Sequence, residues 1–322
     1  MKKHVKKFVL GLLIAGASTT ALANSWPSNP IRMVVPYPPG GATDFSARAY
    51  ADELRKVLKQ TIIVENKAGA AGEIGAQFVA AAKADGYTIL LGALGSLAIN
   101  SLLPSKKQQY EFPSAFEGVS MATSTPLAIV VRSDLPAKNV QELIALAKDR
   151  KGELSYGSAG YGSSQHMVGE KFQQATETEL LHVPYQGSGP ALSDLIGGQV
   201  DLIFDTMPTL MGHVKNPKLR FIGITTSERS SSLPEVPTLQ EQGVKDFDIS
   251  TRYVLLAPKG TPKDILDRLS DAMKQAAQVS SVQSAMSTQG ADAVPSSPSE
   301  TNQALQEEVA IWTEVVKNAN LK

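Results

Sequence analysis

Three short segments rich in Gly, Ser and Thr are the parts of this sequence best suited to binding a small molecule. They are residues 37–44, 157–164 and 185–189, and each follows an expected strand and precedes an expected helix. The start of a helix presents backbone N–H groups without intrahelical partners, next to the positive end of the helix dipole. Small side chains let an anion approach these N–H groups. The segments therefore suit a carboxylate or a phosphate.

We expect the three segments to form one anion site, because parallel strands present their carboxyl ends at the same edge of a sheet. Taken singly, each segment could also be an ordinary tight turn. The candidate ligand-binding residues in these segments are Tyr37, Pro38, Pro39, Gly40, Gly41, Ala42, Thr43, Asp44, Ser158, Ala159, Gly160, Gly162, Ser163, Ser164, Tyr185, Gln186 and Gly187.

Signatures of catalysis are missing from the sequence. It has no Gly-x-Ser-x-Gly elbow, no Walker loop and no His-Glu-x-x-His pair. The absence of Cys excludes thiol chemistry, iron–sulfur clusters and most structural zinc sites. A secreted hydrolase that uses Ser158, Ser163 or Ser164 with His166 is the enzymatic alternative, and it needs an orienting carboxylate and an oxyanion hole. We expect no catalytic residue, no metal and no cofactor.

The N-terminus has the features of a secretory signal peptide. Four lysines precede an apolar run at residues 8–17, which is too short to span a bilayer as a stable helix. Small residues follow at Ala21 and Ala23, so we expect cleavage after Ala23 and a soluble protein in the periplasm. An uncleaved membrane anchor is the alternative. The lack of a Cys at the cleavage site excludes a lipid anchor.

Length and charge narrow the class of protein further. Removal of residues 1–23 leaves 322 − 23 = 299 residues, a length typical of two domains. The chain has 31 basic and 31 acidic residues, and loss of the four signal lysines leaves 27 against 31. Nucleic-acid binding needs a concentrated basic face, so we expect no nucleic-acid partner.

The hydrophobic pattern alternates between strands and helices. This order is typical of a parallel sheet covered by helices. The pattern changes around residues 120–125, and Asn139 with Glu142 forms a capping-box arrangement at a helix start. We expect strands at 31–35, 61–65, 87–91, 127–131, 154–156, 180–183, 200–204, 220–225 and 253–257, and helices at 43–59, 75–82, 140–148, 165–174, 190–196, 262–279 and 299–318.

Motifs along the whole chain beyond the leader resemble those of the tripartite tricarboxylate transporter substrate-binding proteins, the Bug or TctC type. The most specific motif is the opening Arg-Met-Val-Val-Pro-Tyr-Pro-Pro-Gly-Gly-Ala-Thr-Asp at 32–44, which continues to Ala47-Arg48. Further matching stretches, in order, are 64–67 with 69–75, 84–88, 156–160 with His166 and Gly169-Glu170, 182–187, 198–201, 233–238 and 257–262.

This resemblance implies a type II-like periplasmic binding protein, with two doubly wound α/β domains joined by crossing strands and a ligand cleft between them. The domains would be 24–125 plus 226–322, and 126–225. Backbone amides and waters of the loops at 37–44 and 158–164 would hold one ligand carboxylate. Residues matching Ser96, Tyr185, Gln186 and Asp205 would lie near the ligand.

The resemblance also implies a monomer that delivers its ligand to a membrane permease with a large and a small subunit. Family ligands include mono-, di- and tricarboxylates, amino acids and aromatic acids. A sensor that presents the bound acid to a receptor kinase is an alternative.

Two positions depart from the family pattern. Arg252 stands where the family more often has an aromatic residue, usually Trp, and the polar run 123–125 precedes Pro126 where small apolar residues are common. We predict that Arg252 faces the cleft and pairs with a second ligand carboxylate. A surface arginine is the alternative.

Overall fold

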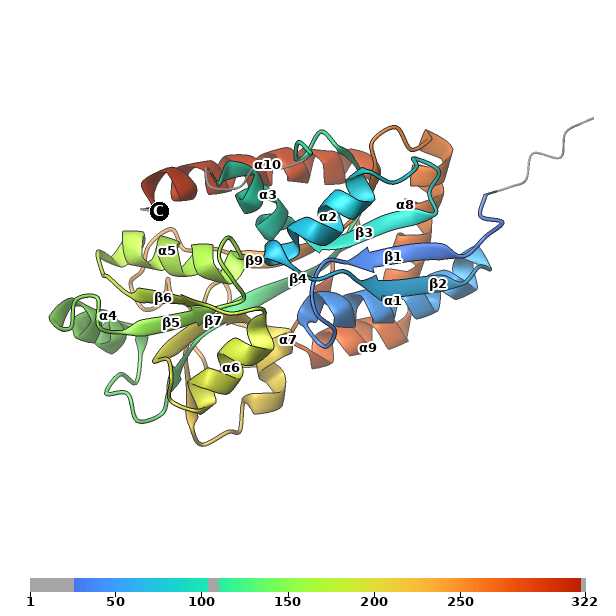
Figure 1. Ribbon diagram of the computed structural model, residues 1–322. Helices are drawn as coiled ribbons and strands as arrows, with labels where there is room; N and C mark the ends of the chain where they lie inside the picture. The colour runs from blue at the N-terminus through green and yellow to red at the C-terminus, as the bar shows by residue number, and fades with distance from the viewer. Residues whose placement is uncertain (1–25, 104–109, 320–322) are drawn as a thin grey trace, which may run out of the picture.

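The computed structural model describes residues 26–103 and 110–319. It confirms the expected α/β class, and two groups of strands lie end to end with helices on both faces (Figure 1). The sheet order is β2-β1-β3-β9-β4-β7-β5-β6, with β8 and β10 both paired to β4. The predicted cleavage site after Ala23 lies outside the described residues. None of the described helices combines the length and the apolarity needed to cross a membrane.

The first group of strands begins with a parallel set that matches the predicted alternation. β1 pairs with β2 and β3 in parallel, whereas β9 runs antiparallel to β3. The strands of this group are β1 (Ile31–Val35), β2 (Ile62–Asn66), β3 (Thr88–Ala93), β9 (Ser250–Pro258) and the two-residue β10 (Asp292–Ala293). Its helices are α1 (Ala42–Leu58), α2 (Glu73–Ala80), α3 (Leu94–Leu102), α8 (Lys263–Ala277), α9 (Ser280–Thr288) and the 3₁₀ turn η1 (Ala70–Gly72).

The second group repeats the arrangement around three parallel strands. β5 pairs with β6 and β7 in parallel, and β8 runs antiparallel to β4. The strands are β5 (Ser155–Ser158), β6 (Leu181–Pro184), β7 (Leu202–Thr206) and β8 (Leu219–Ile224). The helices are α4 (Val140–Asp149), α5 (Ser164–Thr176), α6 (Ser188–Ile196), α7 (Met207–Leu210) and the 3₁₀ turn η2 (Met211–His213). The predicted cap at Asn139 is present, because its side chain accepts a hydrogen bond from the Glu142 N–H.

One long strand joins the two groups. β4 (Phe116–Arg132) pairs with β9 up to Pro126, and from Leu127 onward it pairs with β7 and β8. The polar residues before Pro126 therefore do not interrupt the strand. Thr123 and Thr125 are fully buried, and the Thr125 hydroxyl donates to the Gly290 carbonyl at 3.4 Å. The domain boundaries at 125/126 and 225/226 stay a prediction.

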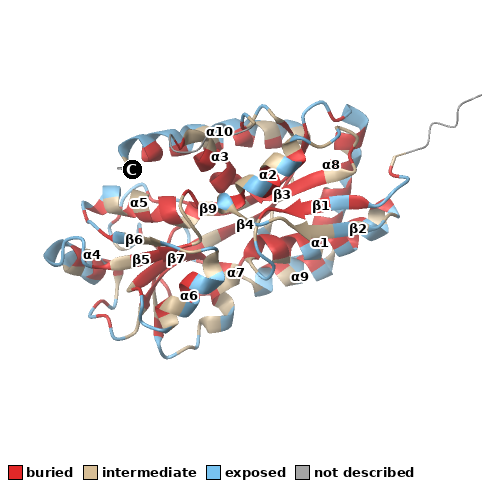
Figure 2. Ribbon diagram, in the orientation of Figure 1, coloured by how far each residue is buried: buried red, intermediate tan, exposed pale blue. Residues whose placement is uncertain are grey.

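The apolar core is continuous between the two groups (Figure 2). The C-terminal helix α10 (Pro298–Asn318) contributes Trp312 and Val316 to it and starts with a capping box at Ser297. It packs against α3 and also reaches α5, where Gln174 donates to the Val315 carbonyl at 3.1 Å. Helix α3 was not predicted. It begins directly after β3 with no side-chain cap to mark its start.

Candidate ligand-binding site

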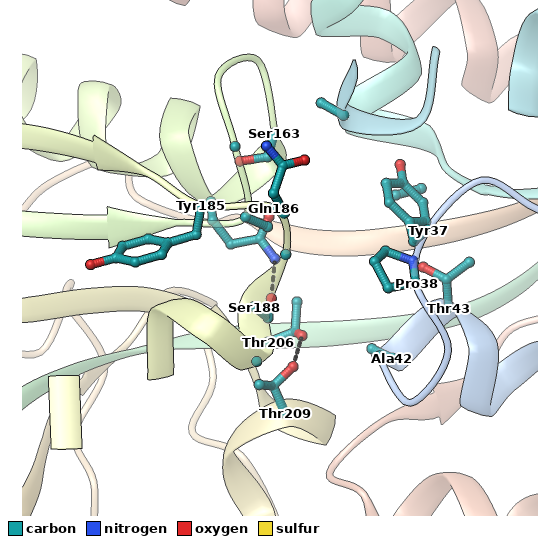
Figure 3. Close-up of a pocket in the computed structure, with 18 of the residues that line it drawn as sticks. Tyr37, Pro38, Ala42, Thr43, Ser163, Tyr185, Gln186, Ser188, Thr206 and Thr209 are labelled. Atoms are coloured by element: carbon teal, nitrogen blue, oxygen red, sulfur yellow. Dashed lines mark hydrogen bonds between the residues drawn. The ribbon is translucent and has the colours of Figure 1, made fainter. Parts of the chain in front are cut away.

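A cavity of about 800 Å³ lies between the two groups of strands, where the carboxyl ends of β1, β5, β6 and β7 face one another. Figure 3 shows the two walls. One carries Tyr37, Pro38, Ala42 and Thr43, and the other carries Ser163, Tyr185, Gln186, Ser188, Thr206 and Thr209. Among the described residues that line the cavity, none is Asp, Glu, Lys or Arg. Donors and acceptors here are backbone groups, hydroxyls, amides and the imidazole of His213.

The loop between β1 and α1 forms the first wall and is held from behind by an ionic cluster. The Asp44 carboxylate accepts hydrogen bonds from the Gly40 N–H at 3.0 Å, from Arg48 at 2.9 Å and from Asn66 at 2.9 Å. Asn66 also donates to the Tyr37 carbonyl at 3.0 Å. Burial alone would raise the pKa of Asp44, but these hydrogen bonds, led by that from Arg48, outweigh it and lower the pKa. Asp44 thus shapes the loop from outside the cavity.

The loop between β5 and α5 faces the first loop. Gly160 and Gly162 have φ angles of 125° and 80°, a region that L side chains rarely adopt, so this tight turn requires glycine. Ser163 caps α5 by accepting from the His166 N–H at 3.2 Å. The next residue, Ser164, donates its N–H to the Ser96 hydroxyl on α3 at 3.2 Å. This contact joins the second group to α3 of the first group at the cavity.

The start of α6 supplies a third set of N–H groups to the cavity, at Ser188 and Gly189. The Ser188 hydroxyl donates to Asp205 at 2.9 Å, and the Gln165 amide donates to the same oxygen at 3.2 Å. Asp205 is 1% exposed and does not line the cavity. Burial raises its pKa against the opposing effect of its hydrogen bonds. Asp205 therefore orients two lining side chains from behind.

Most predicted site residues lie at the cavity, and a minority support it from behind. Tyr185 lines the wall with its hydroxyl turned to Asp194, to which it donates at 2.8 Å. The predicted residues that line the cavity are Tyr37, Pro38, Pro39, Gly40, Gly41, Ala42, Thr43, Ser96, Ala159, Gly160, Ser163, Ser164, Tyr185, Gln186 and Gly187. Those that lie behind it are Asp44, Ser158, Gly162 and Asp205.

The prediction that Arg252 faces the cleft is wrong. Side chains alternate between the two faces of a strand, and on β9 it is Thr251 and Tyr253 that line the cavity. The Arg252 side chain instead forms an ion pair with Glu308 of α10, whose other carboxylate oxygen accepts from Trp312 at 2.8 Å. Its charge is therefore neutralised within the protein.

Several lining residues were not predicted. They include the glycine-rich turn at 69–72, which the sequence shows as a run of small residues before α2. Thr251 and Tyr253 share the face of β9 opposite to that of Arg252, but the period of two does not tell which face meets the cavity. Gln165 and Ser188 lie at the starts of α5 and α6, which the sequence analysis did single out. Thr206, Thr209 and His213 lie at α7 and η2, where it expected no helix.

The hydrolase alternative does not match the geometry. Ser158 is 1% exposed, does not line the cavity, and has its hydroxyl 2.6 Å from Nε2 of His182 instead of His166. Ser163 caps a helix, and the Ser164 hydroxyl lies 3.2 Å from that of Ser96. The His166 Nδ1 atom accepts from the Gly162 N–H at 3.2 Å, so it is not poised to take a proton from these serines.

Comparison with known proteins agrees with this architecture. A family model described as "Tripartite tricarboxylate transporter family receptor" matches residues 46–321. Protein BugT of Bordetella pertussis is 38% identical over 318 residues, which cover 98% of this chain and 97% of the relative.

Solved structures of similar proteins include the periplasmic binding protein BugD, with a TM-score of 0.85, 34% identity and coverage of 92% of this chain and 99% of that one. MatC of Rhodopseudomonas palustris with bound malate has a TM-score of 0.84, 33% identity and coverage of 90% and 100%. A second R. palustris protein, solved with adipate, has a TM-score of 0.86, 32% identity and coverage of 91% and 97%. By its sequence and its fold, this chain belongs to the tripartite tricarboxylate transporter receptor family of solute-binding proteins.

Proposed function

We propose that this protein captures a small organic carboxylate in the periplasm and delivers it to a tripartite tricarboxylate-type membrane transporter. The observation that carries this proposal is the convergence of the starts of α1, α5 and α6 on one cavity. Each start offers N–H groups that have no partner within the helix, and together they can satisfy several lone pairs of a carboxylate.

The charge pattern of the walls supports reversible capture. A carboxylate that enters this cavity meets neutral hydrogen-bond donors and helix dipoles instead of a lysine or an arginine. Such a site holds an anion without the large desolvation cost of a buried cationic side chain. The receptor family and the described geometry both favour binding without turnover.

Size and relatives favour a dicarboxylate as the first ligand to test. The cavity of about 800 Å³ lies in the range of small-molecule sites, so a short diacid fits with bridging waters. Two relatives have been solved with malate and with adipate. Monocarboxylates, tricarboxylates, amino acids and aromatic acids belong in the same screen.

The test is a thermal-shift screen of the mature protein against these classes of acid near neutral pH. A ligand at 100 times its Kd adds about 2.7 kcal/mol of stability, so a true ligand raises the melting temperature by several degrees. A neutral sugar panel is the control. If no organic acid shifts the transition, the proposal is contradicted.

A further inference from the structure

Two stacked histidines lie directly behind the β5–α5 loop and do not line the cavity. The rings of His166 on α5 and His182 on β6 have centroids 3.9 Å apart and an interplanar angle of 12°. The Tyr156 ring continues the stack on His182 at 4.9 Å. His166 is 2% exposed. His182 is half-buried. Stacking that excludes solvent from one of two titratable rings favours their neutral forms.

The pair is bonded to the loop at both of its glycines. The Gly162 N–H donates to Nδ1 of His166 at 3.2 Å, which requires that this nitrogen carries no proton. The Gly160 N–H donates to the Ser158 hydroxyl at 3.1 Å, and this hydroxyl lies 2.6 Å from Nε2 of His182. One loop amide is thus held by an imidazole directly, and the other is held through a serine.

The surroundings favour neutral rings. Burial lowers the pKa of His182 to about 4. The charged group that faces the pair is Glu170 on α5. Its Oε1 atom lies 3.8 Å from Nε2 of His166 and accepts a hydrogen bond from the Tyr156 hydroxyl at 2.8 Å. The ring of Tyr161 lies 5.0 Å from that of His166. Two imidazolium ions stacked at this distance would repel each other.

We propose that His166 and His182 are positioning residues for carboxylate capture, which hold Gly160 and Gly162 so that the amides at the start of α5 face the cavity. The inference rests on the proposed function, in which this loop contacts the acid. Without the acceptor at Nδ1 of His166, the Gly162 N–H would lose this partner, so the loop would loosen and binding would weaken.

The test compares two substitutions of His166. His166→Asn keeps an acceptor near the position of Nδ1 and cannot titrate, whereas His166→Phe keeps a stacked ring and removes the acceptor. Binding of malate and of adipate is measured by titration calorimetry near neutral pH. We expect His166→Phe to lose about tenfold in affinity, the worth of one hydrogen bond. His166→Asn should stay close to the wild type.

The conservative variant separates positioning from a general effect on folding. Equal affinities of the wild type and His166→Phe would overturn the inference. An equal loss of affinity in His166→Phe and His166→Asn would also contradict it, because only His166→Asn keeps an acceptor for the Gly162 N–H.

A readout without ligand keeps the test independent of the proposed function. Hydrogen exchange of residues 158–164, corrected for the intrinsic rate, should be faster in His166→Phe and in Ser158→Ala than in the wild type. The second variant removes the bridge between His182 and Gly160 and serves if His166→Phe does not fold. If no acid binds the wild type, the proposed function fails. Unchanged hydrogen exchange in both variants would contradict the positioning role of the histidine pair.

Discussion

The two loops that face each other across the cavity present similar backbone amides but are held by different chemistry. Behind the β1–α1 loop stands an ionic cluster, in which Asp44 gathers Arg48, Asn66 and the Gly40 N–H. Behind the β5–α5 loop stands a neutral cluster of Ser158, His166 and His182. An anion site without charged walls can thus be supported by charge at one side and by uncharged rings at the other.

The two supports should respond to acid in different pH ranges. The folded-state pKa of Asp44 is lowered, so its contribution to stability is present above its ordinary value of 3.8 and is lost as the pH falls through the lower folded value. The pKa of His182 is lowered from 6.5 to about 4, so its contribution is complete above pH 6.5 and is lost as the pH falls to 4. Between pH 6.5 and about pH 4, only the neutral cluster behind the β5–α5 loop weakens.

The largest effect is expected from removal of the ionic support. Asp44→Ala deprives Gly40, Arg48 and Asn66 of their shared acceptor, and we expect a loss of about 3 kcal/mol in the free energy of unfolding. Ligand affinity should fall as well, because the start of α1 loses its anchor. Urea denaturation measures the first effect and calorimetry the second. Asp44→Asn, which keeps one acceptor oxygen, should lose less, and full stability in both variants would contradict the role of the cluster.

A substitution away from both loops should affect stability alone. Arg252→Ala leaves Glu308, which is 5% exposed, without its ion pair. We expect a loss of about 2 kcal/mol, less than for a fully buried pair because Arg252 is partly exposed. Affinity for the acid should not change. The double variant Arg252→Ala with Glu308→Gln, the matched control, should recover part of the lost stability. Weaker ligand binding in Arg252→Ala would mean that Arg252 does contribute to the site.

The neutral support predicts a pH dependence that a variant can remove. Wild-type stability should decline from pH 6.5 to 4, since the unfolded chain takes up a proton at His182 that the folded chain refuses. In His182→Phe, which cannot titrate, the decline over this range should be shallower. Chemical denaturation at several pH values gives the two slopes. Parallel slopes would show that His182 is not kept neutral by the fold.

The smallest effect is expected from the exposed partner in the ionic cluster. Arg48 is 54% exposed, and Asp44 keeps its bonds to Gly40 and Asn66 without it. We expect Arg48→Ala to lose about 0.5 kcal/mol at low salt and less at high salt, where the pair is screened. A loss as large as that of Asp44→Ala would mean that charge, instead of hydrogen bonding, holds the loop.

The local features of the site could be predicted from sequence, because glycines and helix starts act over short distances. The opening loop at 37–44 and the α5 start at the site, and the Asn139 cap of α4 elsewhere in the fold, all follow from neighbouring residues. The orientation of Arg252 could not, since a period of two separates the faces of a strand without saying which one meets the cavity. That choice depends on Glu308, which lies 56 residues away.

Two further features could not be predicted for the same reason, because each depends on contacts between distant parts of the chain. β4 continues through its polar residues because pairing with β9, far along the chain, satisfies its backbone and overrides local composition. The histidine pair brings together α5 and β6, and no sequence motif joins His166 to His182. Contacts of this kind are set by tertiary packing.

We propose that the cavity recognises the carboxylate group itself. Titration calorimetry of the mature protein with malate and adipate, each beside its dimethyl ester, tests it most directly. We predict that at least one free acid binds saturably and that its ester, similar in carbon skeleton but uncharged, does not. Equal binding of an acid and its ester would contradict this expectation. It would also be contradicted if neither acid bound and no acid of a wider panel bound either.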